Sequence, residues 1–448
     1  MLKKKILVIG ILVLLLFSMG GVEANTDLST EIDNYITTYE EMGIFSGTVL
    51  VAENGKIIIN KGYGYADLEL DVKNQKETKY RIGSLTKQFT AAAVMQLAEQ
   101  NKLKTEDKLS KYIPDYPRGD EIKIKNLLNH TSGIFDYTKT QKFRDMMGKR
   151  IQLKKVIDLF KDKDLIFQPG QKYQYCNSNY VLLGYIIEQV SGLNYEEYLN
   201  KNIFNPLEMN NSGYAYHHKI IKKRASGYVM SPAGKKSNMY HDDATFAHGA
   251  GALYSTTKDL YKWDRALYTN QILTDKSLKQ MFTSGLGNYG FGFKIDELFK
   301  NKRIYHHGGT MGYTASINRY VNDDVTIIVL SNINGTPIDQ LTKDIAAILF
   351  KKEYYVPDLN YELKQEAFKK YAGTYKLDSG REVTIMSNAD KYFVKLKQGP
   401  AFEIIPSGQN EFFLKIMGEK IEFVKDNNGN FNTINIEHVY SSESGTKI

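Results

Sequence analysis

Residues 81–100 constrain the fold of this chain more than any other stretch, because they predict a helix packed on several sides. One face carries apolar residues at spacings of four and three: Leu85, Phe89, Ala92 and Met95. The three alanines at 91–93 and Val94 extend this apolar character around most of the circumference. A helix with so little polar surface belongs inside a domain.

Ser84 and Lys87 give this buried helix a chemical character. Both fall in its first turn, on the same face, directly after the chain-breaking Gly83. Burial and the positive end of the helix dipole both disfavour an ammonium ion, so we expect the pKa of Lys87 to fall. A neutral lysine can take the proton of Ser84 and make it a nucleophile.

The alternative is that Ser84 only caps the helix while Lys87 is solvated. The Ser-x-x-Lys pattern recurs at Ser255–Lys258 and Ser444–Lys447, so the pattern alone does not decide. The stretch Thr256–Asp259 reads as a capping box before a helix over 260–268, which gives the second copy a structural explanation.

Residues 1–24 predict an export signal. Lys3, Lys4 and Lys5 precede an apolar run over 6–17, and Val22 and Ala24 supply small residues for cleavage. We therefore expect a secreted or extracytoplasmic protein. The alternative is an uncleaved N-terminal anchor, although the apolar run is short for a membrane span.

Charge and cysteine content narrow the partners. The formal net charge of +8 on 448 residues is mild; it suits contact with anionic cell-wall polymers and excludes nucleic acid as a partner. Cys176 is the single cysteine, so the chain forms no internal disulfide. The sequence contains no zinc pattern, phosphate loop or dinucleotide motif, so we expect no metal and no cofactor. It does not specify an oligomeric state.

Residues 25–355 predict one α/β unit with its sheet drawn from both ends of the segment. A helix over 27–39 precedes a hairpin that turns at Asn54-Gly55. Residues 101–270 are mostly helical by period. Further strands are expected at 289–295, 304–307, 314–321 and 325–330, before a last helix over 338–350.

Residues 356–448 change character. From 371 to 439 apolar and polar residues alternate in short runs, and turn residues such as Asp378-Ser-Gly380 separate them. This pattern predicts a second, small up-and-down β domain.

Two further motifs carry polar groups suited to a site. Tyr175 and Asn177 lie two residues apart, so both point the same way in an extended segment. In Tyr305–Tyr313, His307 and Thr310 flank Gly308 and Gly309, whose lack of a side chain permits close approach of a ligand. The structural alternatives are a half-buried tyrosine and a strand bulge. His130 reads as a structural turn histidine.

The three motifs in this order resemble the active site of the penicillin-recognising serine hydrolases. They are Ser84-Leu-Thr-Lys87, Tyr175-Cys-Asn177 and His307-Gly-Gly309. The superfamily includes penicillin-binding proteins of the DD-peptidase type, class C β-lactamases, and related esterases and D-peptidases. The similarity spans about residues 28–352, and the tail looks like the small β-barrel domain that often follows. The resemblance implies a five-stranded, largely antiparallel sheet with flanking helices, plus an all-helical subdomain.

The resemblance also implies roles. Ser84 would be the acylated nucleophile, Lys87 its proton acceptor and Tyr175 the proton shuttle to the leaving group. Asn177 would orient Lys87 and the substrate amide. The backbone N–H groups of Ser84 and Thr310 would form the oxyanion hole beside Gly309. His307 stands where many members have lysine and, with the Thr310 hydroxyl, would hold a substrate carboxylate.

The expected protein is thus an exported serine hydrolase that acts on D-amino-acid peptides through a Ser84 acyl-enzyme. The chemistry would be that of a DD-carboxypeptidase or D-aminopeptidase. The alternatives are a carboxylesterase or D-alanyl esterase, a β-lactamase, and a catalytically slow penicillin- or wall-binding protein. The substrate is then a small peptide, ester or β-lactam. Cys176, where the family usually has serine, is either an equally small side chain or a thiol near the site.

Overall fold

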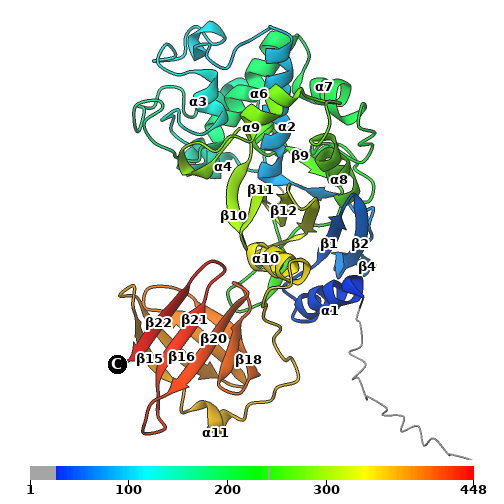
Figure 1. The fold of residues 1–448 in the computed structure, drawn as a ribbon. Helices are drawn as coiled ribbons and strands as arrows, with labels where there is room; N and C mark the ends of the chain where they lie inside the picture. The colour runs from blue at the N-terminus through cyan, green and yellow to red at the C-terminus, as the bar shows by residue number, and fades with distance from the viewer. Residues whose placement is uncertain (1–26, 241–242) are drawn as a thin grey trace, which may run out of the picture.

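The computed structural model describes residues 27–240 and 243–448. Figure 1 shows a helix-and-sheet body joined to a β-barrel at the C-terminus. The expected signal over 1–24 lies outside the described residues. Among the helices that are described, none is long and apolar enough to cross a membrane.

The main sheet is antiparallel and runs in the order β10-β11-β12-β13-β1-β2. Its strands are β10 (Lys294–Leu298), β11 (Asn301–Thr310), β12 (Tyr313–Tyr320), β13 (Val325–Ser331), β1 (Gly47–Glu53) and β2 (Lys56–Tyr63). β1 pairs with β13 in a register that sets Val49 opposite Val329. This pairing confirms that the sheet is drawn from both ends of one α/β unit.

The sheet has six strands, as the residue pattern predicted, whereas the resemblance implied five; β10 and β2 form its edges. The strand expected at 289–295 is also misplaced, since β10 begins only at Lys294. Residues 289–293 instead form a turn against α2: a Cβ on Gly292, whose φ is +78°, would lie 2.8 Å from the Lys87 carbonyl oxygen.

Helices cover both faces of the sheet. α1 (Leu28–Glu41) and α10 (Ile338–Leu349) pack on one face, while α2 (Thr86–Glu99) and α8 (Thr257–Ala266) lie on the other. Hydrophobic burial of both sheet faces organises this three-layer arrangement. α8 begins three residues before the expected helix, and the Thr256 hydroxyl accepts a hydrogen bond from the Asp259 backbone N–H (3.2 Å), which is one of the two bonds of the predicted capping box.

A helical subdomain surrounds the outer part of α2 (Figure 1). Its α-helices are α3 (Ile124–Leu128), α4 (Gln141–Met146), α5 (Leu153–Ile157), α6 (Asn177–Ser191), α7 (Tyr195–Leu199) and α9 (Asp275–Met281). The buried side of α6 shares one apolar cluster with α2, in which residues 91–94 are fully buried. The expected all-round burial of this helix is confirmed.

Short strands connect the main sheet with the helical subdomain. β5 (Tyr80–Arg81), β9 (Leu253–Ser255) and β6 (Gly213–Tyr214) form one small sheet, and β14 (Ile333–Asn334), β7 (Tyr228–Met230) and β8 (Lys236–Asn238) form another. β3 (Tyr65–Asp67) pairs with β4 (Val72–Lys73). β5 leads directly into the turn that carries Ser84.

The C-terminal body is a closed eight-stranded barrel, which confirms the up-and-down β architecture. Its strands are β15 (Gly373–Leu377), β16 (Glu382–Asn388), β17 (Lys391–Leu396), β18 (Ala401–Gly408), β19 (Glu411–Leu414), β20 (Glu419–Lys425), β21 (Phe431–Glu437) and β22 (Ser442–Lys447); α11 (Gln365–Phe368) precedes them. β15 pairs with β22 to close the barrel.

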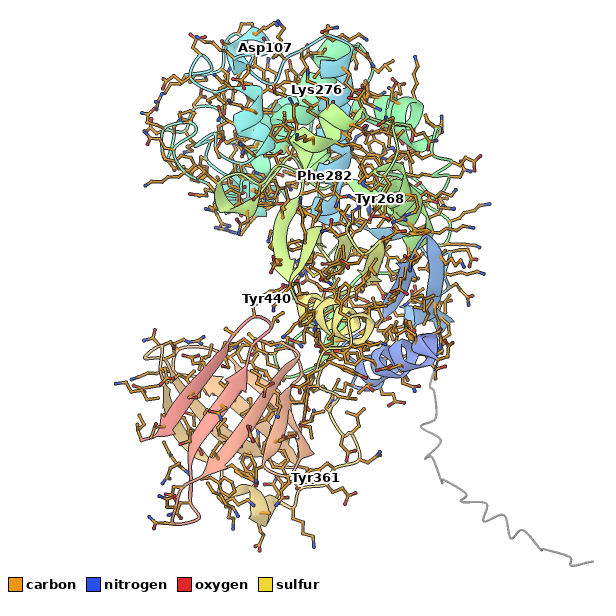
Figure 2. The ribbon with its side chains drawn as sticks, viewed as in Figure 1. Asp107, Tyr268, Lys276, Phe282, Tyr361 and Tyr440 are labelled. Carbon is orange, nitrogen blue, oxygen red and sulfur yellow. The ribbon has the colours of Figure 1, made fainter. Side chains whose placement is uncertain are left out.

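The barrel packs on the α1–α10 side of the sheet. Phe413 of β19 is 1% exposed and meets the ring of Tyr39 on α1 edge-on, with ring centroids 6.1 Å apart. Tyr440, at the tip of the β21–β22 hairpin, points toward the main sheet (Figure 2). Its hydroxyl lies 3.3 Å from Arg303 of β11, so the two bodies share an apolar contact and a polar one.

Candidate active site

Ser84 lies where the entry to α2 meets the end of strand β11. It sits in a single 3-10 turn, Gly83–Leu85, that runs into α2. A Cβ on Gly83, whose φ is +50°, would lie 2.7 Å from the Gly309 carbonyl oxygen, and one on Gly308 only 2.0 Å from the Ile82 carbonyl oxygen. Only glycines permit this approach of the two backbones, which sets Ser84 against Gly308 and Gly309.

Lys87 is fully buried beside Ser84. Its Nζ lies 3.0 Å from Ser84 Oγ, 3.0 Å from Asn177 Oδ1 and 2.7 Å from the Ala250 carbonyl oxygen. Burial lowers the pKa of Lys87 to about 7, although the negative charge of Asp136 acts in the opposite direction. The expected fall in this pKa is confirmed, with burial as its cause.

The three oxygen atoms beside Lys87 Nζ can accept the three N–H bonds of the ammonium form, and in the neutral form they fix where the lone pair points. A neutral lysine has two N–H donors and one lone pair. The Asn177 Oδ1 and Ala250 carbonyl oxygens can only accept, so they occupy the two N–H groups. The lone pair then faces Ser84 Oγ and can receive its proton.

Asn177 is held in place by Asp136, a residue that the sequence analysis missed. The Asp136 Oδ2 atom accepts hydrogen bonds from the backbone N–H of Asn177 (3.0 Å) and from its Nδ2 (3.2 Å). The amide group is thereby fixed with its oxygen toward Lys87. No local sequence pattern marks Asp136.

Tyr175 is the third group beside Ser84 and Lys87. Lys87 Nζ lies 4.8 Å from the centre of the Tyr175 ring. Burial raises the pKa of Tyr175, and a hydrogen bond with the Ser84 side chain lowers it. The phenol is therefore protonated at neutral pH and within reach of the nucleophile, where it can transfer a proton.

His130 supports Tyr175 from behind. It is fully buried, its ring lies 4.4 Å from the Tyr175 ring, and its Nδ1 accepts a hydrogen bond from the Cys176 backbone N–H (3.2 Å). The expected turn is present, because the φ of His130 is +59°. The Cys176 thiol points away toward the Ile134 carbonyl oxygen (3.3 Å), and burial raises its pKa to about 12. This placement favours the interpretation of Cys176 as a small, inert side chain.

His307 does not join this group. Its Nδ1 lies 2.7 Å from Asp339 Oδ1, at the start of α10 and hence on the opposite face of the sheet from Ser84. Side chains alternate along a strand, so His306 and Gly308 face α2 while His307 faces α10. The structure therefore does not support His307 as the holder of a substrate carboxylate.

His306 occupies the position beside Tyr175 instead. It is 2% exposed, its Nδ1–H donates to the His307 carbonyl oxygen (2.6 Å), and its Nε2 accepts from the Tyr289 hydroxyl (2.9 Å). Its ring centroid lies 6.1 Å from that of Tyr175. Burial and the charge of Lys87 hold the pKa of His306 well below its usual range, so the ring is neutral at pH 7.

The strand register also changes which residue can supply the second backbone N–H of the oxyanion hole, which was expected at Thr310. Thr310 and Tyr313 close a two-residue turn, so they form the hydrogen-bonded pair that ends the hairpin. Gly309 then belongs to a non-hydrogen-bonded pair, and its N–H points to the edge of β11 that β10 leaves open beyond Tyr305. Gly309, rather than Thr310, can share an oxyanion with the Ser84 N–H.

A cleft of about 290 Å³ opens above Ser84 and Asn177. Its wall is largely apolar, with Tyr137, Phe143, Met147, Phe246 and Met311 prominent, and Thr310 and Asn334 at one side. None of the side chains that line it carries a charge. Within the described residues no group of His, Cys, Asp and Glu is arranged to hold a metal ion.

Comparisons with known proteins agree with this geometry. The Beta-lactamase family matches residues 32–350, and a domain of unknown function, DUF3471, matches residues 361–447. Penicillin-binding protein 4* of Bacillus subtilis is 30% identical over 419 residues, which cover 86% of this chain and 92% of that protein. Teichoic acid D-alanine hydrolase of Staphylococcus aureus is 30% identical over 67% of this chain and 73% of that protein.

A solved structure resembles this chain over both the helix-and-sheet body and the barrel. The octameric penicillin-binding protein homologue from Pyrococcus abyssi superposes with a TM-score of 0.69 at 25% identity, over 93% of this chain and 99% of that one. The match of the Beta-lactamase family to most of the chain agrees with the Ser84–Lys87–Asn177 arrangement. The chain is therefore a member of the Beta-lactamase family, a serine hydrolase related to the penicillin-binding proteins.

Proposed function

We propose that this protein is an exported hydrolase that uses a Ser84 acyl-enzyme to cleave esters or amides of D-amino acids whose leaving group is uncharged. One observation carries the catalytic part: Lys87 is buried, its pKa is lowered to about 7, and two carbonyl oxygens occupy its N–H groups. The lone pair is thus directed at Ser84 Oγ.

The proposed reaction follows from these contacts. Ser84 Oγ bonds to the substrate carbonyl carbon as its proton passes to Lys87 Nζ, and the oxyanion forms between the N–H groups of Ser84 and Gly309. The carbon–leaving-group bond then breaks, and the leaving atom takes a proton from Tyr175, which recovers one from Lys87. Water reverses the sequence: it attacks the ester carbon, gives up a proton to the same groups, and releases Ser84.

The Tyr175 side of Ser84, where the leaving group departs, supports an uncharged leaving group. A free carboxylate needs a cation or several donors to replace its water. His307 is turned toward Asp339, and His306 is neutral and enclosed. D-Alanyl esters and D-amino-acid amides therefore fit better than peptides that end in a free carboxylate. The name of the teichoic acid D-alanine hydrolase, a relative, supports a D-alanyl group as the acyl part.

The test is turnover of matched substrates by the purified protein. The set consists of an ester and an amide of D-alanine, the L-alanine ester, D-Ala-D-Ala and a chromogenic cephalosporin, with Ser84→Ala as the control. We expect the D-alanine ester or amide to be cleaved fastest. Preferred cleavage of D-Ala-D-Ala would overturn the uncharged leaving group. A single burst of acylation without turnover would identify a slow penicillin-binding protein instead.

Export rests on residues 1–24 alone. We expect secreted protein to begin at or close to Asn25 when its N-terminus is sequenced. Recovery of the full-length chain from membranes only would identify an anchor.

A further inference from the structure

A short turn between β8 and β9 supplies one of the carbonyl groups around Lys87. This turn, η6 (His248–Ala250), presents two consecutive carbonyl oxygens to α2. The Ala250 oxygen accepts from Lys87 Nζ (2.7 Å), and the Gly249 oxygen accepts from the Thr90 hydroxyl (2.6 Å). Lys87 and Thr90 are three residues apart, so they lie on one face of α2. The face that carries the base therefore also carries a hydroxyl that bonds to the same turn.

The conformation of η6 depends on support from its neighbours. His248 has a φ of +36°, which a residue with a side chain adopts rarely and keeps only where the surrounding structure holds it. On one side of the turn, a Cβ on Gly249 would lie 2.5 Å from the Tyr180 carbonyl oxygen of α6. The turn is thus packed between α6 and α2, and Lys87 and Thr90 make the bonds on the α2 side.

The Thr90 hydroxyl belongs to a buried pair of hydroxyl groups. It has one proton to donate, and the Gly249 carbonyl oxygen, which can only accept, is closer (2.6 Å) than the Thr86 carbonyl oxygen (3.3 Å). The Tyr195 hydroxyl of α7 lies 2.6 Å from Thr90 Oγ1 and is therefore the donor in that pair. Burial raises the pKa of Tyr195, so the phenol keeps this proton at neutral pH. The two hydroxyl groups are thus bonded in one direction, toward the turn.

The position of the Ala250 carbonyl oxygen decides where the lone pair of neutral Lys87 points. This oxygen and Asn177 Oδ1 accept the two N–H bonds, which leaves the lone pair toward Ser84 Oγ. Asp136 fixes the Asn177 amide, whereas the Ala250 oxygen is only as fixed as the turn that carries it. Displacement of a reacting group by about 1 Å can slow a reaction by about 10²-fold, so a loosened turn would misdirect the base.

We propose that Thr90, supported by Tyr195, is a positioning residue of this hydrolase. It holds η6 in place, so that the Ala250 carbonyl oxygen directs the lone pair of Lys87 at Ser84. The inference rests on the proposed function in one respect, because it takes Lys87 as the base for Ser84. It adds two residues that act on the base through the backbone of a turn.

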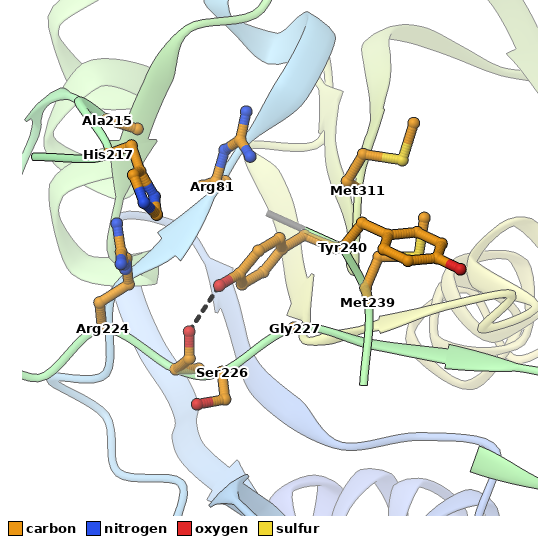
Figure 3. A pocket seen from close by; sticks show the side chains of 11 residues that line it. Arg81, Ala215, His217, Arg224, Ser226, Gly227, Met239, Tyr240 and Met311 are labelled. Atoms are coloured by element: carbon orange, nitrogen blue, oxygen red, sulfur yellow. Dashed lines mark hydrogen bonds between the residues drawn. The ribbon is translucent and has the colours of Figure 1, made fainter. Parts of the chain in front are cut away.

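Thr90 and Tyr195 lie apart from the spaces that could hold a substrate. The described residues that line the cleft do not include either of them, and neither do those that line a smaller cavity beside Met311 (Figure 3). A substitution of either residue therefore leaves the contacts of a bound substrate in place.

The experiment measures acylation of Ser84 by a fluorophosphonate in the purified full chain from pH 5 to 9. Two quantities are obtained at each pH: the limiting rate constant of labelling and the reagent concentration that gives half of it. Thr90→Val keeps the shape of the side chain without its hydroxyl, and Thr90→Ser restores the hydroxyl. Tyr195→Phe removes only the donor to Thr90. Thr342→Val is the matched control, because Thr342 is 1% exposed and its hydroxyl donates to the Ile338 carbonyl oxygen within α10 (2.8 Å).

Thr90→Val should lower the limiting rate constant at least about tenfold at pH values above the Lys87 pKa, because the lone pair is no longer held toward the serine. The half-saturating concentration should stay the same, since the cleft is untouched. Thr90→Ser should recover most of the rate. Tyr195→Phe should lower the rate by a smaller factor, because Thr90 keeps its bond to Gly249. Thr342→Val should keep the full rate.

The pH profile separates positioning from a loss of burial. Thr90→Val leaves in place the titratable groups around Lys87, which lie on other elements: Asp136, His130, Tyr175, Cys176, Tyr180 and His306. Behind the turn, burial lowers the pKa of His248 to about 4 and raises that of Glu188, and both side chains also remain. The midpoint should therefore stay near the Lys87 pKa of about 7 while the plateau falls.

Three results would overturn the positioning role: a full limiting rate in Thr90→Val, an equal loss in Thr90→Ser or Thr342→Val, or a midpoint that moves toward the ordinary lysine value with a rate that recovers in alkali. The last would mean that Thr90 only keeps water from Lys87. If Thr90→Val does not fold, Tyr195→Phe takes its place, and an unchanged rate in that variant contradicts the role equally. Failure of the proposed function looks different, because the unsubstituted protein would then not label at Ser84 or would show no step near pH 7.

Discussion

The two faces of strand β11 carry neighbouring residues in different surroundings and with different roles. On the α2 face, His306 is enclosed, neutral and bonded to Tyr289, and Gly308 lies against the turn that holds Ser84. On the α10 face, Arg303 forms an ion pair with Asp296 (2.7 Å), and His307 lies 2.7 Å from Asp339. The α2 face therefore carries groups beside the nucleophile, whereas side chains on the α10 face bond the strand to neighbouring elements.

The difference shows how little residue type says about role on a strand. His306 and His307 are adjacent and chemically identical, yet the pleat sends them to opposite sides of the sheet. If the motif is read one residue later along the strand, the buried histidine beside Tyr175 is replaced by one that contacts Asp339 on the opposite face. The substitutions below test the contrast between the faces.

The largest effect is expected on the α2 face at Lys87. Lys87→Ala should slow acylation of Ser84 by a fluorophosphonate by roughly 10²–10⁴-fold, because the serine loses its general base. Stopped-flow labelling measures this rate. Lys258→Ala is the matched control, since Lys258 is the exposed lysine of the second Ser-x-x-Lys and its loss should leave the rate unchanged. Equal loss in both variants would contradict the assignment.

The second prediction concerns pH. Only neutral Lys87 accepts the proton, so the acylation rate should fall about tenfold per pH unit below the lysine pKa of about 7 and level off above it. The pKa of His306 lies well below its usual range, so this histidine should add no step near its usual value. Rate–pH profiles from pH 5 to 9 check this. A midpoint near the ordinary lysine pKa would show that Lys87 is charged at pH 7.

The third prediction compares the two histidines directly. His306→Ala should lower kcat/KM for a neutral ester by at least about tenfold, because the supports of Tyr175 lose their fixed geometry. His307→Ala should change it little, since it breaks only a partly exposed contact with Asp339 on the other face of the sheet. If His307→Ala proves the more damaging, His307 reaches the substrate and the contrast between the faces is wrong.

The smallest effects on the reaction of Ser84 are expected from the barrel contacts. Tyr440→Ala removes contacts of 3.3 Å between its hydroxyl and Arg303, yet Tyr440 is 57% exposed, so the free energy of unfolding should fall by only about 0.5 kcal/mol. Phe413→Ala should lower it by about 3 kcal/mol, because this ring is buried against Tyr39. Both should keep Ser84 labelling. Loss of labelling on Tyr440→Ala would mean that the α10 face also governs the chemistry.

The sequence pattern was sufficient to predict the elements that short stretches of sequence determine. Apolar spacing predicted α2, the Asn54-Gly55 turn predicted the β1–β2 hairpin, and alternation predicted the barrel strands. The approach of Lys87 to Ser84 also follows from helix spacing alone.

Contacts between segments that lie far apart in the chain could not be predicted from the sequence. Asp136 and the Ala250 carbonyl oxygen reach the site through tertiary packing, and no local motif marks either. The turn at 289–293 replaced a predicted strand because Gly292 packs on α2.

The burial of Lys87 also ties the stability of the native state to proton uptake. An ordinary lysine has a pKa of 10.5, whereas Lys87 in the folded chain has one of about 7. Between these values the unfolded chain holds a proton that the native chain has released, so unfolding takes up a proton and stability rises with pH across this window. Below pH 7 the native state must instead keep a buried charge. The lysine that prepares the nucleophile therefore makes the protein intrinsically less stable in acid than in mild alkali.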